Sequence, residues 1–478
     1  MKRLACLTLL ALAFAPSALA LVQAPVVAPN GPGRAVTRVS SPSGPYLPYL
    51  NGGRVTQLGL LHSAGLETFG LFRPGPLPAG LSSERPLVVF FHSYGGDGDG
   101  ELEAYTRFSD EADQRHWYVL APDQDVPLFG IAPNGSSRRR KTFGSDEAQR
   151  RLDLTLRWVL ENYPIDRERI YGVGFSMGGG DMLSYAAQHR NPARGAFAAV
   201  AVNAGTLCLS QEYWRNPASQ DALQVAVGGG APPNANNAFD FERLSSLRYA
   251  SPFGSSVLDL GVRHPVQNLV GVPIQAWIDT REPSSHLTDF VDDLELVLGP
   301  SQPTGLFQRH DVLGTGPSAH VWETFDFTQV CNSLAAQRLV VPDVADLLVS
   351  RDARYGDVRV TRVNSREFGE LRHDFSRVGV PGMIDRVSVV DCVNIARVEL
   401  DAAVLGIGMA SAAYQVQLEG NPNRSVRLDL KGVSRPLQVL RNGVDLTQSP
   451  GTAWAYQAAT STLVLVSAAN ATDLWALR

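Results

Sequence analysis

The chain has 478 residues, of which 44% are hydrophobic and 19% are charged. These proportions are typical of a globular protein with a sizeable core, and the length allows two or three domains. The formal net charge of −5 argues against nucleic acid or an anionic membrane surface as the main partner.

The first twenty residues have the pattern of a secretory signal peptide. Lys2 and Arg3 precede the apolar run 4–15, and Pro-Ser-Ala-Leu-Ala follows at 16–20. A basic segment, a short apolar segment and a small-residue end are the three parts of such a signal. A membrane anchor is the alternative, but this apolar run is short for a membrane span. We expect cleavage after Ala20 and a secreted or periplasmic protein, and we find no other stretch that approaches a membrane span.

The next part of the chain divides into a lead-in and an α/β region. Residues 21–50 are rich in Pro, Gly and Ser and predict an extended lead-in. Over residues 51–342, helical patterns alternate with continuous apolar runs, which are typical of strands buried on both faces of a parallel sheet. These runs are 87–91, 118–121, 170–173, 197–202 and 273–278, and the clearest helical pattern is 146–163. The alternation predicts an α/β domain with a doubly wound, mostly parallel sheet.

A glycine-rich segment, G-V-G-F-S-M-G-G-G at 172–180, follows the third of these strands. Ser176 lies in a G-x-S-x-G pattern between a buried strand and a helical run, the context in which a nucleophilic serine is held on a sharp turn. Such a turn lifts the hydroxyl out at the carboxyl end of the sheet, where ligands bind in folds of this class. The N–H group of Met177, at the helix start, can then face a developing oxyanion. The alternative is a plain joint between a strand and a helix.

A second segment with a possible role precedes the serine. The strand at 87–91 ends in His92, and the loop Ser-Tyr-Gly-Gly follows at 93–96. This segment resembles the H-G-x-x-G oxyanion loop of esterases, with Ser93 where glycine is usual. By that resemblance, the backbone N–H group of Tyr94 is the second oxyanion donor and His92 braces the loop. The alternative is an ordinary turn with a satisfied histidine, and the position of the loop before the serine favours the functional interpretation.

The segment after Ser176 contains candidates for a general base and for an acid. His320 lies in the loop 314–322, before the helix-like run 324–337, and His310 is its competitor. The loop context favours His320, because a catalytic histidine after the last strand and before the closing helix suits this fold. A carboxylate must orient the imidazole and stabilise its cation. Asp279, at the tip of the strand 273–278, and Glu282 just beyond it are the candidates, and either could instead be a surface carboxylate.

The order of these segments, which is oxyanion-type loop, serine, acid and histidine, is that of α/β-hydrolases. Residues 54 to about 340 resemble the secreted serine esterases related to polyhydroxybutyrate depolymerases and to feruloyl and acetylxylan esterases. The runs Y-P-I-D-R-E-R-I-Y at 163–171 and G-F-S-M-G-G at 174–179 carry this resemblance. Two features depart from the pattern: Ser93 replaces a glycine, and Ile278-Asp279 stands where His-Gly often precedes the acid.

The resemblance implies acyl transfer on a carboxylic ester, polymeric or carbohydrate-linked. His320 takes the proton of Ser176, which attacks the ester carbonyl. Glu282 is favoured as the acid, because in related hydrolases it commonly lies nine residues after the proline that opens the strand, here Pro273. Asp279 stays as the rival. No cofactor or metal is expected, and the acidic, glycine-rich run 95–101 is better explained as a solvated loop than as a calcium site.

The pattern of the chain changes after residue 342. Short period-2 runs with turns such as Asn442-Gly443 and Pro450-Gly451 predict a separate β-sandwich domain at 345–478. Its aromatic residues either belong to its core, which we favour, or form a polymer-binding surface. The residues in question are Trp454, Tyr456 and Trp475.

Three cysteines remain once the signal peptide is removed. An exported protein meets an oxidising compartment, so one disulfide is plausible. Cys208 and Cys331 are the candidate pair, and their bond would tie the helix after His320 to the sheet near the site. Cys392 would then be the odd thiol.

Two other functions stay as alternatives. One is a binding protein in which the hydrolase fold is inactive and the sandwich does the work. The other is a serine peptidase of the prolyl-oligopeptidase type, which is less favoured because the sequence shows no propeller. The sequence leaves the substrate and the oligomeric state open.

Overall fold

The structure, a computed structural model, describes most of the chain after residue 53 and two short strands before it. The described residues are 22–27, 35–39, 54–62, 65–75, 80, 83–94, 96, 98–104, 106, 108–123, 126–131, 137–140, 143–227, 237–250, 257–282, 288–376, 378, 380, 384–407 and 413–478. The predicted signal peptide at 1–20 lies outside them. Among the described residues, no helix has the length and apolar character needed to cross a bilayer.

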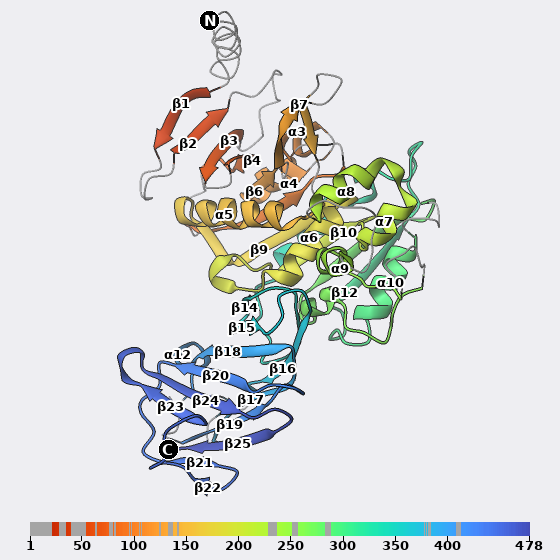
Figure 1. The fold of residues 1–478 in the computed structure, drawn as a ribbon. Coiled ribbons are helices and arrows are strands. Elements are labelled where there is room, and N and C mark those ends of the chain that lie inside the picture. Colours follow the sequence, from red (N-terminus) through yellow and green to blue (C-terminus); the bar gives the residue numbers. More distant parts are fainter. Residues whose placement is uncertain are drawn as a thin grey trace, which may run out of the picture.

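A ten-stranded mixed sheet forms the centre of the α/β region (Figure 1). In spatial order its strands are β1 (Val22–Val27), β2 (Ala35–Val39), β3 (Arg54–His62), β4 (Gly65–Arg73), β6 (Tyr118–Pro122), β5 (Arg85–Phe91), β9 (Ile165–Phe175), β10 (Ala199–Asn203), β11 (Ile274–Asp279) and β12 (Phe307–Val312). The strands from β6 to β12 pair in parallel, and β1 to β4 add an antiparallel extension. The predicted α/β sheet is confirmed, and each predicted strand is present.

Strand β12 was not among the predicted strands. It is the last strand of the sheet and pairs only with β11 among the described strands. Its residues are half-buried or exposed, so it lacks the continuous apolar run that marks the inner strands.

Helices cover both faces of the sheet, because alternate residues of each strand point to opposite faces. On β5, Leu87 and Val89 belong to one apolar cluster and Val88 and Phe90 to another. The first cluster packs against α5 (Asp146–Asn162), α6 (Met177–Gln188), the 3-10 helix η3 (Pro265–Leu269) and α10 (Thr288–Leu298), and the second against α4 (Phe108–Arg115) and α11 (Phe327–Ala335). The doubly wound arrangement therefore follows from inner strands that are apolar on both faces.

Short helices lie at the carboxyl end of β9. They are α7 (Leu209–Arg215), η2 (Pro217–Ser219), α8 (Gln220–Ala226) and α9 (Ala238–Leu244). Their apolar side chains form a small cluster of their own with Phe143 and Met177. Because Met177 directly follows Ser176, this helical group adjoins the glycine-rich turn.

Nearly all the regular elements of the C-terminal region are strands, which lie in two sheets (Figure 1). One sheet contains β13 (Val344–Val349), β16 (Gly369–Asp374), β17 (Asp385–Val393), β19 (Tyr414–Glu419), β25 (Thr472–Leu477), β21 (Val439–Arg441) and β22 (Val444–Asp445). The other contains β14 (Ala353–Tyr355), β15 (Val358–Arg362), β18 (Ile395–Asp401), β20 (Val426–Lys431), β24 (Thr462–Ser467) and β23 (Trp454–Gln457). The predicted strands are confirmed, and both sheets contribute to one apolar cluster.

The aromatic residues of this region belong to its core. Trp454 is 2% exposed and Trp475 is fully buried, and the Trp454 indole N–H donates to the carbonyl of Leu446 at 2.8 Å. Tyr456 is half-buried and donates to the carbonyl of Val433 at 3.1 Å. The alternative of an exposed polymer-binding surface built from these three residues is therefore wrong.

A buried asparagine joins the two regions of the chain. The side-chain amide of Asn268, on η3, donates to the carbonyl of Leu348 at 2.8 Å and accepts from its N–H group at 2.8 Å. It also donates to the carbonyl of Ala187, at the end of α6, at 3.1 Å. One side chain thus fixes β13 against the helices of the α/β region.

The predicted disulfide between Cys208 and Cys331 is wrong in this structure. Both cysteines are free and buried. Cys208 follows Leu207, which packs in the cluster on one face of the sheet, whereas Cys331 packs in the cluster on the other face. The sheet separates the thiols, and burial raises the pKa of Cys208 to about 11 and that of Cys331 to about 12.

The stability of the fold is expected to fall below neutral pH through His264. This buried residue precedes η3, where its Nδ1 accepts from the N–H group of Arg248 at 2.9 Å and its Nε2–H donates to the carbonyl of Asp259 at 3.0 Å. Burial lowers its pKa to about 4 from the ordinary 6.5. The stabilisation is therefore complete above pH 6.5 and is lost as the pH falls towards 4, a loss of about 2 kcal/mol at pH 5.

Urea unfolding at pH 7 and pH 5 measures this effect. The His264→Asn variant keeps an acceptor for the Arg248 N–H group but cannot take up a proton. Its free energy of unfolding should fall less between the two pH values than that of the wild-type protein. Equal losses in the two proteins would contradict the assignment.

Candidate active site

Ser176 is held on a sharp turn between β9 and α6. Its backbone has φ 55° and ψ −124°, a region that a residue with a side chain rarely adopts. Its N–H group donates to the carbonyl of Asn203 at 2.9 Å, and its carbonyl accepts from Gly179 at 3.0 Å and from Thr206 at 3.0 Å. These bonds to β10 and to the loop after it hold the strained residue in place.

The turn requires glycine at positions 174 and 178, because there is no room for a side chain at either position. A Cβ atom on Gly174 would lie 2.4 Å from the carbonyl oxygen of Gly178. A Cβ atom on Gly178 would lie 2.3 Å from the carbonyl oxygens of Phe91 and His92. The G-x-S-x-G pattern is thus explained by close backbone approach on both sides of the serine.

Ser176, His320 and Glu282 form a continuous chain of hydrogen bonds. The Nε2 atom of His320 lies 2.8 Å from the Ser176 Oγ, and its Nδ1 lies 2.9 Å from an Oε of Glu282. The Glu282 side chain is 2% exposed, whereas that of His320 is 37% exposed. The imidazole therefore stands between a buried carboxylate and a hydroxyl at the surface of the site.

This chain of bonds fixes the tautomer of His320. A carboxylate only accepts hydrogen bonds, so Nδ1 carries the proton and donates it to Glu282. Nε2 is then unprotonated and accepts from the hydroxyl of Ser176. In this arrangement Nε2 can take up the serine proton, and the buried carboxylate stabilises the cation that results.

Asp279, the rival acid, contacts Arg281 instead of His320. Its Oδ1 accepts from the backbone N–H of Arg281 at 2.9 Å and from Nε at 3.0 Å, and its Oδ2 accepts from a terminal guanidinium nitrogen at 2.6 Å. These bonds hold the pKa of Asp279 below its ordinary value. Asp279 is therefore ionised at neutral pH, and it orients Arg281.

Arg281 in turn holds the loop that carries His320. Its guanidinium donates to the carbonyl of Gly316 at 2.7 Å and to that of Ser318 at 3.3 Å. On the other side of the loop, the side-chain amide of Asn203 donates to the carbonyl of Val321 at 3.0 Å. The imidazole is thus positioned by contacts on both sides of it in the chain.

His92 and Glu101 brace the loop after β5. The ring of His92 is fully buried, and its nitrogens lie 2.7 Å from the carbonyl oxygen of Asp123 and 2.8 Å from that of Ser93. The Glu101 carboxylate, 5% exposed, accepts from the Ser93 N–H at 2.9 Å and from the Trp322 indole N–H at 2.8 Å. One buried carboxylate therefore ties this loop to the segment directly after His320.

Two further predicted residues lie beside the serine. Met177 is the first residue of α6, where backbone N–H groups have no partner within the helix. Tyr94 is 41% exposed, and its ring stacks on Phe143 with centroids 5.5 Å apart. Both line a cavity of about 350 Å³ that also contacts Ser176 and His320.

His310, the competing base, lies away from this group. Its ring stacks on Trp277 of β11 with centroids 4.0 Å apart, and partial burial lowers its pKa. Among the described residues, no group of three or more His, Cys, Asp or Glu side chains is arranged to hold a metal ion.

Sequence reasoning did not identify Glu101, Arg281 or Asn203. Each is an ordinary polar residue that contacts the active-site loops across the chain; Glu101 and Trp322 are 221 positions apart, and Arg281 and Gly316 are 35 apart. A signal was present only for Arg281, which stands between the two candidate acids in D-T-R-E.

The chain is similar in structure to several solved hydrolases, at low sequence identity. An S-formylglutathione hydrolase from Agrobacterium tumefaciens matches with 13% identity over 60% of this chain and 95% of that chain, at a TM-score of 0.41. An acetyl xylan esterase from Paenibacillus sp. R4 matches with 13% identity over 64% and 89%, at a TM-score of 0.40. A Pyrococcus furiosus esterase matches with 16% identity over 62% and 95%, at a TM-score of 0.39. No family model and no curated protein sequence matches the chain.

Replacing the Glu101 carboxylate with an apolar side chain is expected to destabilise the protein. In Glu101→Leu, the N–H donors of Ser93 and Trp322, which share one carboxylate oxygen, lose their acceptor, and two buried hydrogen bonds are left unmade at a cost of about 2–3 kcal/mol. Thermal or urea unfolding measures the change. Glu323→Leu is the matched control, since Glu323 is exposed and adjoins Trp322. Equal stability of the two variants would contradict the bracing role of Glu101.

Proposed function

We propose that this chain is a serine hydrolase that cleaves carboxylic esters through an acyl-enzyme on Ser176. The observation that carries the proposal is the hydrogen-bonded chain from the Ser176 Oγ through His320 to Glu282. The chain of bonds stands at the carboxyl end of a parallel sheet and opens into a cavity, as expected of an α/β-hydrolase. A buried acid, an oriented imidazole and an exposed hydroxyl are the parts that acyl transfer requires.

The proposed reaction begins with proton transfer from Ser176 to the Nε2 of His320. The Oγ forms a bond to the carbonyl carbon of the ester, and the carbonyl oxygen becomes an oxyanion. As the intermediate collapses, His320 gives its proton to the leaving alcohol and the acyl-enzyme remains. Water then attacks the acyl carbon as His320 takes one of its protons. The bond between the acyl carbon and Oγ breaks, His320 returns the proton to Oγ, and the carboxylic acid leaves. Glu282 stabilises the imidazolium in both halves of the reaction.

The oxyanion is assigned to two backbone N–H groups. That of Met177 is free at the start of α6, where the helix dipole adds to the stabilisation of negative charge. That of Tyr94 is assigned from its place in the loop that Glu101 and His92 brace. Fixed donors of this kind act without reorganising during the reaction, so the bracing of the loop contributes to catalysis.

Both aromatic and polar side chains line the cavity beside Ser176. Tyr94 and Phe143 are the aromatic ones, and Glu212, Arg215 and Asn216 of the helical group are polar. Such a lining suits an ester that has both an apolar part and hydroxyl groups. A polymeric or carbohydrate-linked ester is therefore the proposed substrate class.

The remaining predictions complete the proposal. Residues 1–20 are proposed as a cleaved signal peptide of a secreted or periplasmic enzyme, followed by a lead-in at 21–50. Residues 51–342 are proposed as the catalytic domain and 345–478 as a β-sandwich domain. The apolar cluster to which both C-terminal sheets contribute supports the sandwich.

Three substitutions test the proposed chemistry in hydrolysis of p-nitrophenyl acetate. Ser176→Ala should lower kcat/KM roughly 10⁴-fold, because the nucleophile is gone. Glu282→Gln should lower it roughly 10³-fold, because the amide no longer fixes the tautomer or stabilises the imidazolium. Asp279→Asn makes the same chemical change at a carboxylate that does not contact His320. It should lower kcat/KM less than about tenfold.

The outcomes separate the alternatives. Hydrolysis by Ser176→Ala at the wild-type rate would exclude the mechanism. A larger loss in Asp279→Asn than in Glu282→Gln would reverse the choice of acid. If the wild-type protein hydrolyses neither this ester nor a peptide ester, the inactive binding protein becomes the better interpretation.

A further inference from the structure

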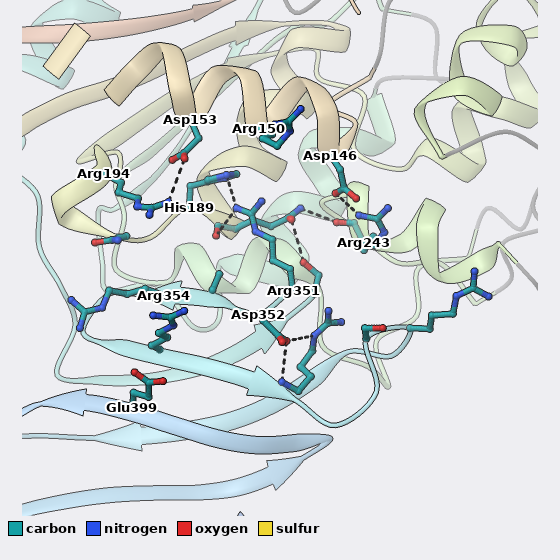
Figure 2. A pocket seen from close by; sticks show the side chains of 18 of the residues that line it. Asp146, Arg150, Asp153, His189, Arg194, Arg243, Arg351, Asp352, Arg354 and Glu399 are labelled. Atoms are coloured by element: carbon teal, nitrogen blue, oxygen red, sulfur yellow. Dashed lines mark hydrogen bonds and ion pairs between the residues drawn. The ribbon is translucent and has the colours of Figure 1, made fainter. Parts of the chain in front are cut away.

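A second cavity, of about 790 Å³, lies between the α/β region and the C-terminal strands. Side chains from α5, α9 and the 3-10 helix η1 (Pro192–Arg194) line it from one side, and side chains from β14, β15 and β20 line it from the other. We call it the interface groove. Figure 2 shows Arg194 and Asp153 on the side of the α/β region and Arg354 and Glu399 on the strands opposite. It shares no lining residue with the cavity at Ser176.

The interface groove carries an excess of positive charge. Nine arginine and lysine side chains line it, against five aspartate and glutamate side chains. This excess stands out in a chain whose net charge is −5. Clustered cations repel one another and lower the stability of the fold, so a local excess of this size needs an explanation.

Each acidic side chain of the groove is already paired. Asp146 and Asp240 bind Arg243, Asp153 binds Arg194 at 3.4 Å, Asp352 binds Arg362 at 3.3 Å, and Glu399 binds Lys431 at 2.5 Å. These pairs use the charges of Arg194, Arg243, Arg362 and Lys431. Arg359 lies opposite Glu399 in the β15–β18 pair, and Lys431, Arg397 and Arg359 together hold the pKa of Glu399 below its ordinary value against the effect of burial. Five acidic side chains nevertheless cannot match nine cations, so an excess of positive charge remains.

Two of the remaining cations have partners on the α/β side. Arg150 binds Glu147 at 2.9 Å, and Arg351 donates to the carbonyl of Gln188 at 3.2 Å and to the Nε2 of His189. Burial, together with the neighbouring Arg351 charge, holds the pKa of His189 well below its ordinary value, so His189 adds no charge at neutral pH. The contacts of Arg351 join the two regions beside the groove, whereas the Arg150 pair lies within α5.

Three guanidinium groups are left. Among the described residues, those of Arg354 on β14, Arg359 on β15 and Arg366 make no ion pair, and all three line the groove. Guanidinium groups bind carboxylates and phosphates through two parallel hydrogen bonds. Three such groups in one concave site can bind a ligand with several oxyanion groups.

The lining also limits the chemistry of the ligand. Phe239 is the one aromatic residue of the groove, and its ring already packs edge-on against Phe368 at 5.1 Å. The groove thus lacks the stacking surfaces that single-stranded nucleic acids use. A hydrophilic oligoanion with no aromatic part fits the lining best.

We propose that the interface groove binds a hydrophilic oligoanion through Arg354, Arg359 and Arg366. The anionic groups are carboxylates, as in an oligosaccharide of acidic sugars, or phosphates, as in an inorganic polyphosphate.

Isothermal titration at low salt tests the proposal with two probes, trigalacturonate and inorganic tripolyphosphate. The wild-type protein should bind at least one of them, and the probe that binds identifies the anionic group. The double variant Arg354→Gln/Arg359→Gln should raise the Kd at least about tenfold, because two charge-assisted contacts are lost. The variant Arg354→Lys/Arg359→Lys keeps the charge but loses the paired hydrogen bonds. Its Kd should lie between those of the wild-type protein and the glutamine double variant.

The matched control is Arg372→Gln/Arg435→Gln. Both residues are exposed in the C-terminal region and lie outside the groove, so the change in net charge is identical. Its Kd should stay within about twofold of wild type, since distant surface charges are largely screened. Hydrolysis of p-nitrophenyl acetate should be unchanged in all variants. Binding of neither probe to the wild-type protein, or equal weakening in the two glutamine double variants, would overturn the proposal.

Discussion

The strained backbone of Ser176 is the constraint on which the rest of the site depends. A positive φ at a residue with a side chain costs about 1–3 kcal/mol, and it persists only where the surroundings enforce it. Here Gly174 and Gly178 allow the strand and helix backbones to meet, and two hydrogen bonds of the Ser176 backbone, to the carbonyl of Asn203 and from the N–H group of Thr206, complete the turn. The turn projects the hydroxyl of Ser176 from the sheet towards His320. The hydrogen bond between them also requires that the loop carrying His320 be held in place.

Three buried carboxylates divide the work of positioning. Glu282 contacts the imidazole directly, Asp279 orients Arg281 against the loop that carries His320, and Glu101 ties the loop after β5 to Trp322. A buried carboxylate is costly unless its oxygens accept hydrogen bonds, and each of these accepts from fixed donors. One of these carboxylates, Glu282, therefore contacts the imidazole itself, whereas Asp279 and Glu101 hold loops in place. The hydrogen-bond donor beside each carboxylate determines its role.

A feature could be predicted from local sequence patterns when the residues that form it are close together in the chain, and it could not when they are far apart. Local sequence patterns predicted Ser176 and the inner strands. The order of segments along the chain and the family resemblance predicted His320 and Glu282. The bond of Glu101 to Trp322 depends on how segments 221 positions apart meet, which no local pattern encodes. For the same reason the pairing of Cys208 with Cys331 failed, because the sequence does not show which face of the sheet each residue occupies.

The most direct test of Ser176 as the proposed nucleophile is covalent labelling with a fluorophosphonate, with the adduct located by peptide mass spectrometry. The wild-type protein should carry one adduct per chain, on Ser176. In His320→Ala the labelling rate should fall about 10²-fold or more, because the base that activates the hydroxyl is missing. An adduct on another residue, or a labelling rate that does not change in His320→Ala, would contradict the assignment of Ser176 and His320.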